Sequence, residues 1–200
     1  MKHILLLIIS LILSTPVLLG QSVTTHISYK NLASNANGDT IYYKPGVQLA
    51  WADFKGTPDP HSGAGAITAS GFSFHSQLHR QGNKTSLTLE VYAYFIKSRS
   101  WKKPGAQSAY HLTHEQHHLD ITYLGALNLI KRLRQAKFTT KNYRAVILQI
   151  FEEANRENEN MQHQYDRETQ HSIHTSQQEI WNEKVRKMLK EATNQLNPED

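Results

Sequence analysis

The chain has 200 residues and no cysteine, which excludes a disulfide framework and lipid attachment through cysteine. Its formal net charge of +5 comes from basic residues that are scattered along the sequence, which indicates a solvated surface and argues against a nucleic-acid partner. Stability must therefore come from one hydrophobic core, to which a bound metal could add.

The first 20 residues have the pattern of a secretory signal peptide. Lys2 precedes an apolar run over residues 4–13, and Gly20 supplies a small residue at a cleavage point. An uncleaved membrane anchor is the alternative, but the run is short for a bilayer span and Pro16 interrupts its continuation. We expect residues 1–20 to be removed on export to the periplasm or the cell exterior, leaving no stable membrane anchor.

The N-terminal half of the remaining chain has the features of a β-sheet. Residues 21–38 are polar and are expected to form a flexible segment before a single domain over residues 39–196. The clearest strand is at residues 85–97, where apolar and polar side chains alternate. A turn signal at residues 81–83 pairs this strand with residues 66–78 as a β-hairpin.

The C-terminal half has helical periodicity. Apolar residues at a spacing of three and four predict a helix over residues 107–135, a second helix from about Thr140 and a third from about Thr175. The fold class expected is therefore α+β, with an N-terminal antiparallel sheet followed by a helical C-terminal part.

A metal-binding motif lies in the first predicted helix, where residues 114–118 read H-E-x-x-H. Positions i and i+4 share a helix face, so His114 and His118 can direct two imidazoles at one Zn²⁺ ion. The Glu115 carboxylate could then take a proton from a water bound to that ion. The alternative is a solvated helix turn that happens to be rich in histidine.

Catalytic zinc usually has three protein ligands, so one more is expected. Asp166 could complete the site, because carboxylates also bind zinc, and His111 lies on the same face as His114 but would place three ligands on one helix. Asp120 could orient an imidazole from behind. The polar residues at the junction of the second and third helices provide the downstream candidates: His163, Tyr165, Asp166, Glu168, His171 and His174.

Three segments resemble motifs of a bacterial family of predicted secreted zinc-dependent proteases, which is otherwise of unknown function. They are residues 49–56 (L-x-W-x-D-F-x-G), residues 114–121 (H-E-Q-x-H-x-D-I) and residues 165–171 (Y-D-x-x-T-x-H), the last followed by Gln178 and Trp181 (Q-x-x-W). His117 and Ser172 depart from the family pattern, since each replaces a glycine. The resemblance favours His171 as the third zinc ligand, beside His114 and His118, in a zincin-like domain.

These observations lead to one functional expectation and two alternatives. We expect a secreted zinc metallopeptidase that hydrolyses a peptide or protein substrate, with Glu115 as general base and Tyr165 as a donor to the oxyanion. The predicted hairpin, through residues 85–97 or 66–78, would form the wall of the substrate cleft. A non-enzymatic exported metal-binding protein and an inactive protease-fold binding module are the alternatives. The sequence does not indicate the oligomeric state.

Overall fold

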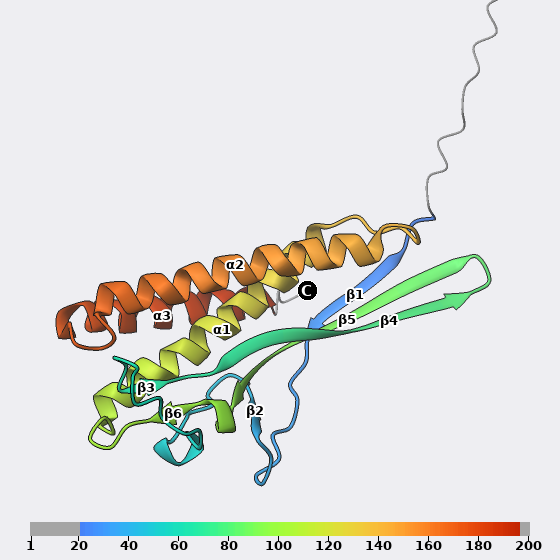
Figure 1. Ribbon diagram of the computed structural model, residues 1–200. Coiled ribbons are helices and arrows are strands. Elements are labelled where there is room, and N and C mark those ends of the chain that lie inside the picture. Colours follow the sequence, from blue (N-terminus) through green and yellow to red (C-terminus); the bar gives the residue numbers. More distant parts are fainter. Residues whose placement is uncertain (1–20, 197–200) are drawn as a thin grey trace, which may run out of the picture.

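The computed structural model describes residues 21–196. The signal peptide predicted for residues 1–20 therefore lies outside the described residues. Figure 1 shows strands in the N-terminal half and three long helices in the C-terminal half, with the helices stacked on one side of the sheet. This arrangement confirms the predicted α+β class. Within the described residues, no helix combines the length and the apolar character needed to cross a membrane.

One long strand organises the main sheet. It is β5 (Lys84–Ile96), which pairs antiparallel with β4 (Ser70–Gln81) along one edge. Its other edge pairs in parallel with β1 (Thr24–Tyr29) and antiparallel with β2 (Thr40–Tyr42). The β4–β5 hairpin turns at Gly82, whose φ of +57° is the left-handed conformation that glycine adopts without strain. The hairpin predicted from the sequence is confirmed.

The alternation along β5 divides its side chains between a buried and an open face. The buried side chains are Leu87, Leu89, Val91, Ala93 and Phe95, none of which is exposed to solvent. They pack against α1 (Ala109–Gln135), which contacts the sheet on one side and both other helices on the other. Burying a leucine, valine or phenylalanine side chain stabilises a fold by about 1.5–3 kcal/mol, so this contact fixes α1 firmly on the sheet.

Two further helices cover α1. These are α2 (Tyr143–Thr169) and α3 (Thr175–Leu196). The polar residues 155–160 do not end the second helix, because α2 continues through them to Thr169. As a result Asp166, which the sequence placed near a junction between helices, lies on the last turns of α2.

The structure differs from expectation in residues 21–38. Residues 24–29 of this segment form β1 and pair with β5. Thr25, Ile27 and Tyr29 alternate as the half-buried side chains of β1, and Ile27 and Tyr29 pack against the core. The main-chain pairing and this period-two burial order a segment that composition alone suggested was flexible.

A second, two-stranded sheet lies near the start of α1. It consists of β3 (Ala66–Ile67) and β6 (Trp101–Lys102), which pair antiparallel. Lys103 N donates a hydrogen bond to Gly65 O (2.7 Å), which extends the pairing by one residue. This small sheet borders the candidate site.

Candidate metal centre

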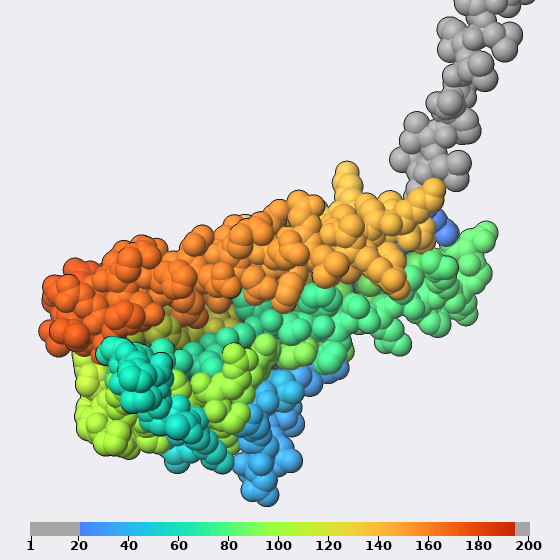
Figure 2. All heavy atoms as spheres, viewed as in Figure 1, coloured from blue at the N-terminus to red at the C-terminus, as the bar shows by residue number. Residues whose placement is uncertain are grey.

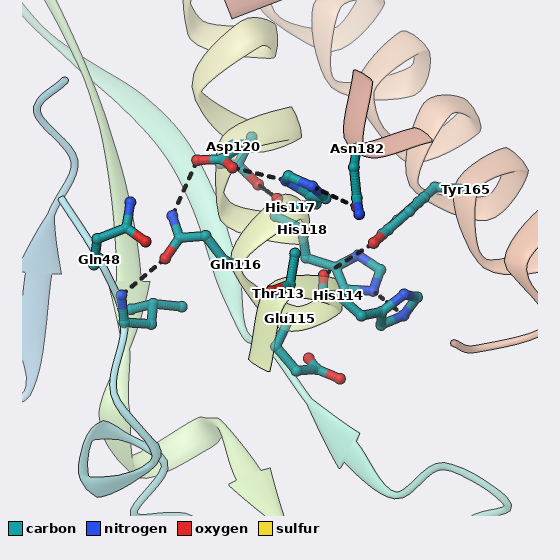
Figure 3. Close-up of polar contacts among 12 residues, drawn as sticks. Gln48, Thr113, His114, Glu115, Gln116, His117, His118, Asp120, Tyr165 and Asn182 are labelled. Carbon is teal, nitrogen blue, oxygen red and sulfur yellow. Dashed lines mark hydrogen bonds and ion pairs between the residues drawn. The ribbon is translucent and has the colours of Figure 1, made fainter. Parts of the chain in front are cut away.

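The H-E-x-x-H motif lies on the second and third turns of α1. Ser108 caps the helix, since its Oγ accepts a hydrogen bond from His111 N at 3.1 Å. His114 and His118 project together toward α2, and His114 is only 3% exposed. Figure 3 shows the neighbouring side chains leaving α1 in other directions, with Gln116 pointing toward the segment that carries Gln48.

The two histidines meet Asp166 in a nearly equilateral triangle. Asp166 Oδ1 lies 3.2 Å from His114 Nε2 and 3.2 Å from His118 Nε2. The two Nε2 atoms are themselves 3.2 Å apart. Ligand atoms about 2.0–2.1 Å from a tetrahedral Zn²⁺ are separated by about 3.3–3.4 Å, so the triangle has the size of one face of a zinc tetrahedron.

Two further observations fit a metal at this triangle. Asp166 Oδ1 is shielded from solvent and receives no well-aligned hydrogen bond from any described residue. A buried carboxylate oxygen without such a donor is unusual unless a cation occupies the position. Among residues 21–196, His114, His118 and Asp166 are also the one group of three or more such side chains whose ligand atoms all lie within 4.8 Å of each other.

The hydrogen bonds behind His118 fix which of its nitrogens is free. Gln162 Nε2 donates to the carbonyl oxygen of His118 (2.8 Å), an atom that can only accept. The amide oxygen of Gln162 therefore faces His118 Nδ1, 2.6 Å away, and that nitrogen must be the donor. The lone pair of the neutral imidazole then lies on Nε2, at the corner of the triangle.

A longer chain of bonds gives His114 the same tautomer. The Tyr165 hydroxyl donates to the His114 carbonyl (3.3 Å) and accepts from Gln178 Nε2 (2.7 Å). The Gln178 amide oxygen is thereby turned to His114 Nδ1, at 2.9 Å. Both histidines are thus held by glutamine oxygens so that Nε2 can bind a metal.

The charges of the triangle are strongly coupled. Burial lowers the pKa of His118, but the close contact with the Asp166 carboxylate and the charges of Glu115 and Asp166 outweigh it and raise this pKa to about 9. Burial acts in the opposite direction on Asp166, yet its contacts with His114 and His118 hold its pKa well below the usual range. Without a metal, the triangle therefore retains a proton that a divalent cation could replace.

The triangle opens into a cleft of about 830 Å³. Glu115 lines this cleft together with both histidines, and the Thr68 hydroxyl donates to Glu115 Oε2 at 2.7 Å. The cleft lies between the segment around β3 and the C-terminal half of α2. In Figure 2 these are the teal segment and the orange-to-red helix that faces it.

His171, which the resemblance favoured as a ligand, lies beside the triangle. Its Nδ1 is 3.4 Å from Asp166 Oδ1, but its side chain is 65% exposed and it is outside the group of three. It follows α2 in a turn where Gln170, His171 and Ser172 all have positive φ (49°, 52° and 72°). Ser172, in the place of the family's glycine, thus adopts the conformation that favours glycine. Asp166, the alternative from the sequence, occupies the third corner.

Tyr165 lies behind the metal triangle. It is fully buried, its ring stacks on that of His114 (centroids 4.6 Å apart), and it is not among the residues that line the cleft. Burial raises the pKa of its hydroxyl, and the bonds to His114 and Gln178 occupy it. A donor to an oxyanion would have to face the cleft, so this position favours an orienting role for Tyr165.

Other sequence candidates are distributed around the cleft. His111 and His163 line it, and Ser108 Oγ lies 2.9 Å from His111 Nδ1. His174 is outside the cleft lining, with Nδ1 3.4 Å from Ser176 Oγ. Glu168 accepts a hydrogen bond from Trp181 Nε1 at 2.7 Å and is likewise outside the lining.

Asp120 orients a histidine, but not one of the triangle. Its carboxylate contacts His117 Nδ1 at 3.0 Å and accepts bonds from Tyr43 and Gln116. Gln116 in turn accepts a hydrogen bond from Leu49 N (2.8 Å), which ties residues 49–56 to the motif helix. His117 fills the space between Asp120 and Asn182 on α3. Two resembling segments are thus joined through this network.

Fold and site together define an α+β protein with a His-His-Asp group close enough to hold a metal ion. Residues 97–172 match a family described as a bacterial protein of unknown function (DUF922). This stretch contains α1, α2 and all three corners of the triangle, but neither the main sheet nor α3. No curated protein and no solved structure matches the chain.

Proposed function

We propose that this protein is an exported, zinc-dependent metallopeptidase. The observation that carries the proposal is the triangle of His114, His118 and Asp166 at the wall of an open cleft that also contains Glu115. Three protein ligands on one side of a metal leave a fourth position toward the cleft, which is the arrangement of catalytic rather than structural zinc sites.

Each group at the site would have a separate role in hydrolysis. A bound Zn²⁺ would polarise the scissile carbonyl and acidify a water molecule. Glu115 would accept the proton of that water and pass it to the leaving amine. The Thr68 hydroxyl lies 2.7 Å from Oε2 and 3.1 Å from the main-chain oxygen of Glu115. Within the described residues no side chain bonds Oε1, so this oxygen is free to face the water. The glutamines would keep both histidines in the tautomer that binds metal.

The small sheet provides an edge for an extended substrate. Because Gly65 O is bonded to Lys103 N, the main-chain groups of Ala66, one residue later in the antiparallel pairing, point away from β6. Ala66 and Thr68 line the cleft, so a peptide could pair with this edge. The sequence suggested residues 85–97 or 66–78 as the wall of the substrate cleft. Because β5 has a paired strand on both edges, only the start of the 66–78 segment offers a free edge for a peptide.

The proposal is tested with a protein that lacks residues 1–20, loaded with zinc and incubated with a broad peptide library. We expect hydrolysis by this protein and a loss of at least about 100-fold in the Glu115→Gln variant at equal zinc content. Zinc bound by both proteins without hydrolysis by either would contradict the proposal and favour the non-enzymatic metal-binding alternative. Absence of residues 1–20 from the protein recovered outside the cytoplasm would support export.

A further inference from the structure

The cleft extends well beyond the metal triangle along one face of α2. Asp166, Gln162 and Glu159 all line it, at the spacing of three and four residues that places side chains on one helix face. Hydrogen bonds hold this part of α2 against α1. Gln162 bonds both the carbonyl and Nδ1 of His118, and Asn158 Nδ2 donates to Ile121 O at 2.8 Å. The helix pair therefore fixes the position of Glu159 relative to the triangle of His114, His118 and Asp166.

Glu159 differs from the other charged groups of the cleft because it has no partner among the described residues. Glu115 is bonded to Thr68, and Asp166 is in contact with the histidines. Lys103, the one lysine in the cleft lining, donates to the Ser62 carbonyl. Glu159 thus places an uncompensated negative charge in the cleft.

The other acidic residues of α2 show that this is not a general property of the helix. Glu153 and Glu157 both form ion pairs with Arg132 on α1. Glu152, one heptad before Glu159, is exposed and does not line the cleft. Only at Glu159 does a carboxylate of α2 combine cleft position with the absence of an intramolecular partner within the described residues.

We propose that Glu159 selects peptides that carry a lysine or arginine two or three residues from the scissile bond. This inference rests on the proposed peptidase function. Seven residues of helix separate Glu159 from Asp166 by about 10 Å along the axis. An extended peptide advances about 3.3 Å per residue, so a side chain at Glu159 belongs to a residue about three positions away, or two if a long side chain leans along the cleft.

The proposal is tested with peptide pairs that differ only in lysine or glutamine at each position around a cleaved bond. The zinc-loaded protein should prefer lysine by about three- to fivefold in kcat/KM at two or three positions from that bond, mainly through KM, as expected of a solvent-accessible ion pair. High salt should reduce this preference. Glu159→Gln should abolish it, and Glu159→Lys should reverse it in favour of the glutamine peptides, because the new ammonium group repels a lysine.

Glu152→Gln is the matched control, because it removes the same charge from the same helix outside the cleft, and it should keep the lysine preference. Binding of the same peptides to zinc-loaded Glu115→Gln separates the two proposals, since it does not require hydrolysis. Lysine-selective binding that depends on Glu159 would support the inference even if no peptide were cleaved, which would overturn only the peptidase function. Equal binding and cleavage of lysine and glutamine peptides would overturn the inference and leave the peptidase proposal intact.

Discussion

Nε2 of His114 on α1 lies 3.2 Å from Oδ1 of Asp166 on α2, although the two residues are far apart in sequence. The contact forms because α1 is fixed on the sheet and α2 packs along it in the opposite direction. One helix therefore supplies two imidazoles and the other supplies the carboxylate. Substitutions on these two helices test whether these three side chains form a metal centre.

The third ligand is tested by comparing Asp166 with His171. Asp166→Asn should lower zinc affinity by at least about 100-fold, because it removes the anionic corner of the triangle. His171→Ala should have a much smaller effect, since His171 is mostly exposed and lies outside the triangle. Competition with a chromophoric chelator measures both. A larger loss for His171→Ala would assign the third position to His171 and contradict Asp166 as the third ligand.

The two glutamines are expected to act through the histidines. Gln178→Leu and Gln162→Leu should each weaken zinc binding by about 10–100-fold, because each removes the acceptor that holds Nδ1–H. The corresponding changes to glutamate should restore part of the affinity, since a carboxylate accepts the Nδ1–H bond but cannot donate to the His118 carbonyl or the Tyr165 hydroxyl. Gln164→Leu is a control on α2, where the side chain bonds only Glu168. Leucine variants that bind zinc like the wild type would show that the tautomers need no such support.

The metal-free protein should lose stability as the pH rises from about 6.5 to about 9. His118 has a folded-state pKa of about 9, above its ordinary value, so its contribution is complete below about 6.5 and disappears as the pH passes 9. The difference should be on the order of 2 kcal/mol, measured by urea unfolding with chelator present. The lowered pKa of Asp166 acts with the opposite sign, since its contribution is present above about pH 4 and is lost on acidification.

The same pKa predicts the pH dependence of metal binding. Zinc must displace the proton of His118, so apparent zinc affinity should rise with pH until about 9. In His118→Ala, the loss of apo-protein stability between pH 6.5 and 9 should disappear. If the stability of the wild-type apo-protein is flat over this interval, the His118–Asp166 ion pair does not exist in solution.

The close contact of α1 and α2 is tested at Gly125. A Cβ at this position would meet Asn158 Nδ2 and a Phe72 ring carbon, each at 2.7 Å. Gly125→Ala should therefore destabilise the protein by about 1–3 kcal/mol and also weaken zinc binding, because it pushes α2 and Asp166 outward. Gly63→Ala, where a Cβ meets nothing within 4 Å, should change neither. If Gly125→Ala leaves both stability and zinc affinity unchanged, the two helices can move apart without disturbing the metal centre.

Local pattern predicted the hairpin and the motif helix. The alternation in β5 and the Gly82 turn act between neighbouring residues, and the i, i+4 spacing of His114 and His118 follows from helix geometry alone. The pairing of β1 with β5 was not predicted, because a parallel partner distant in sequence leaves no local signal.

The rest of the site depends on helix packing, which the sequence does not show directly. Asp166 and His171 were both candidates, and the choice between them depended on α2 continuing to Thr169. Gln162 carried no sequence signal, although it lies four residues before Asp166 on the same face of α2. Gln178 was noted within a motif without a role. The bond between Thr68 and Glu115 was not predicted, because the segment after β3 approaches Glu115 only in the folded chain.

Zinc titration of the metal-free protein lacking residues 1–20 tests the central claim most directly. We predict one zinc ion per chain, a higher melting temperature on zinc addition, and loss of both in the His114→Ala, His118→Ala double variant. A protein that binds no zinc at neutral pH and melts at the same temperature with zinc and with chelator would contradict the metal centre and the peptidase function built on it.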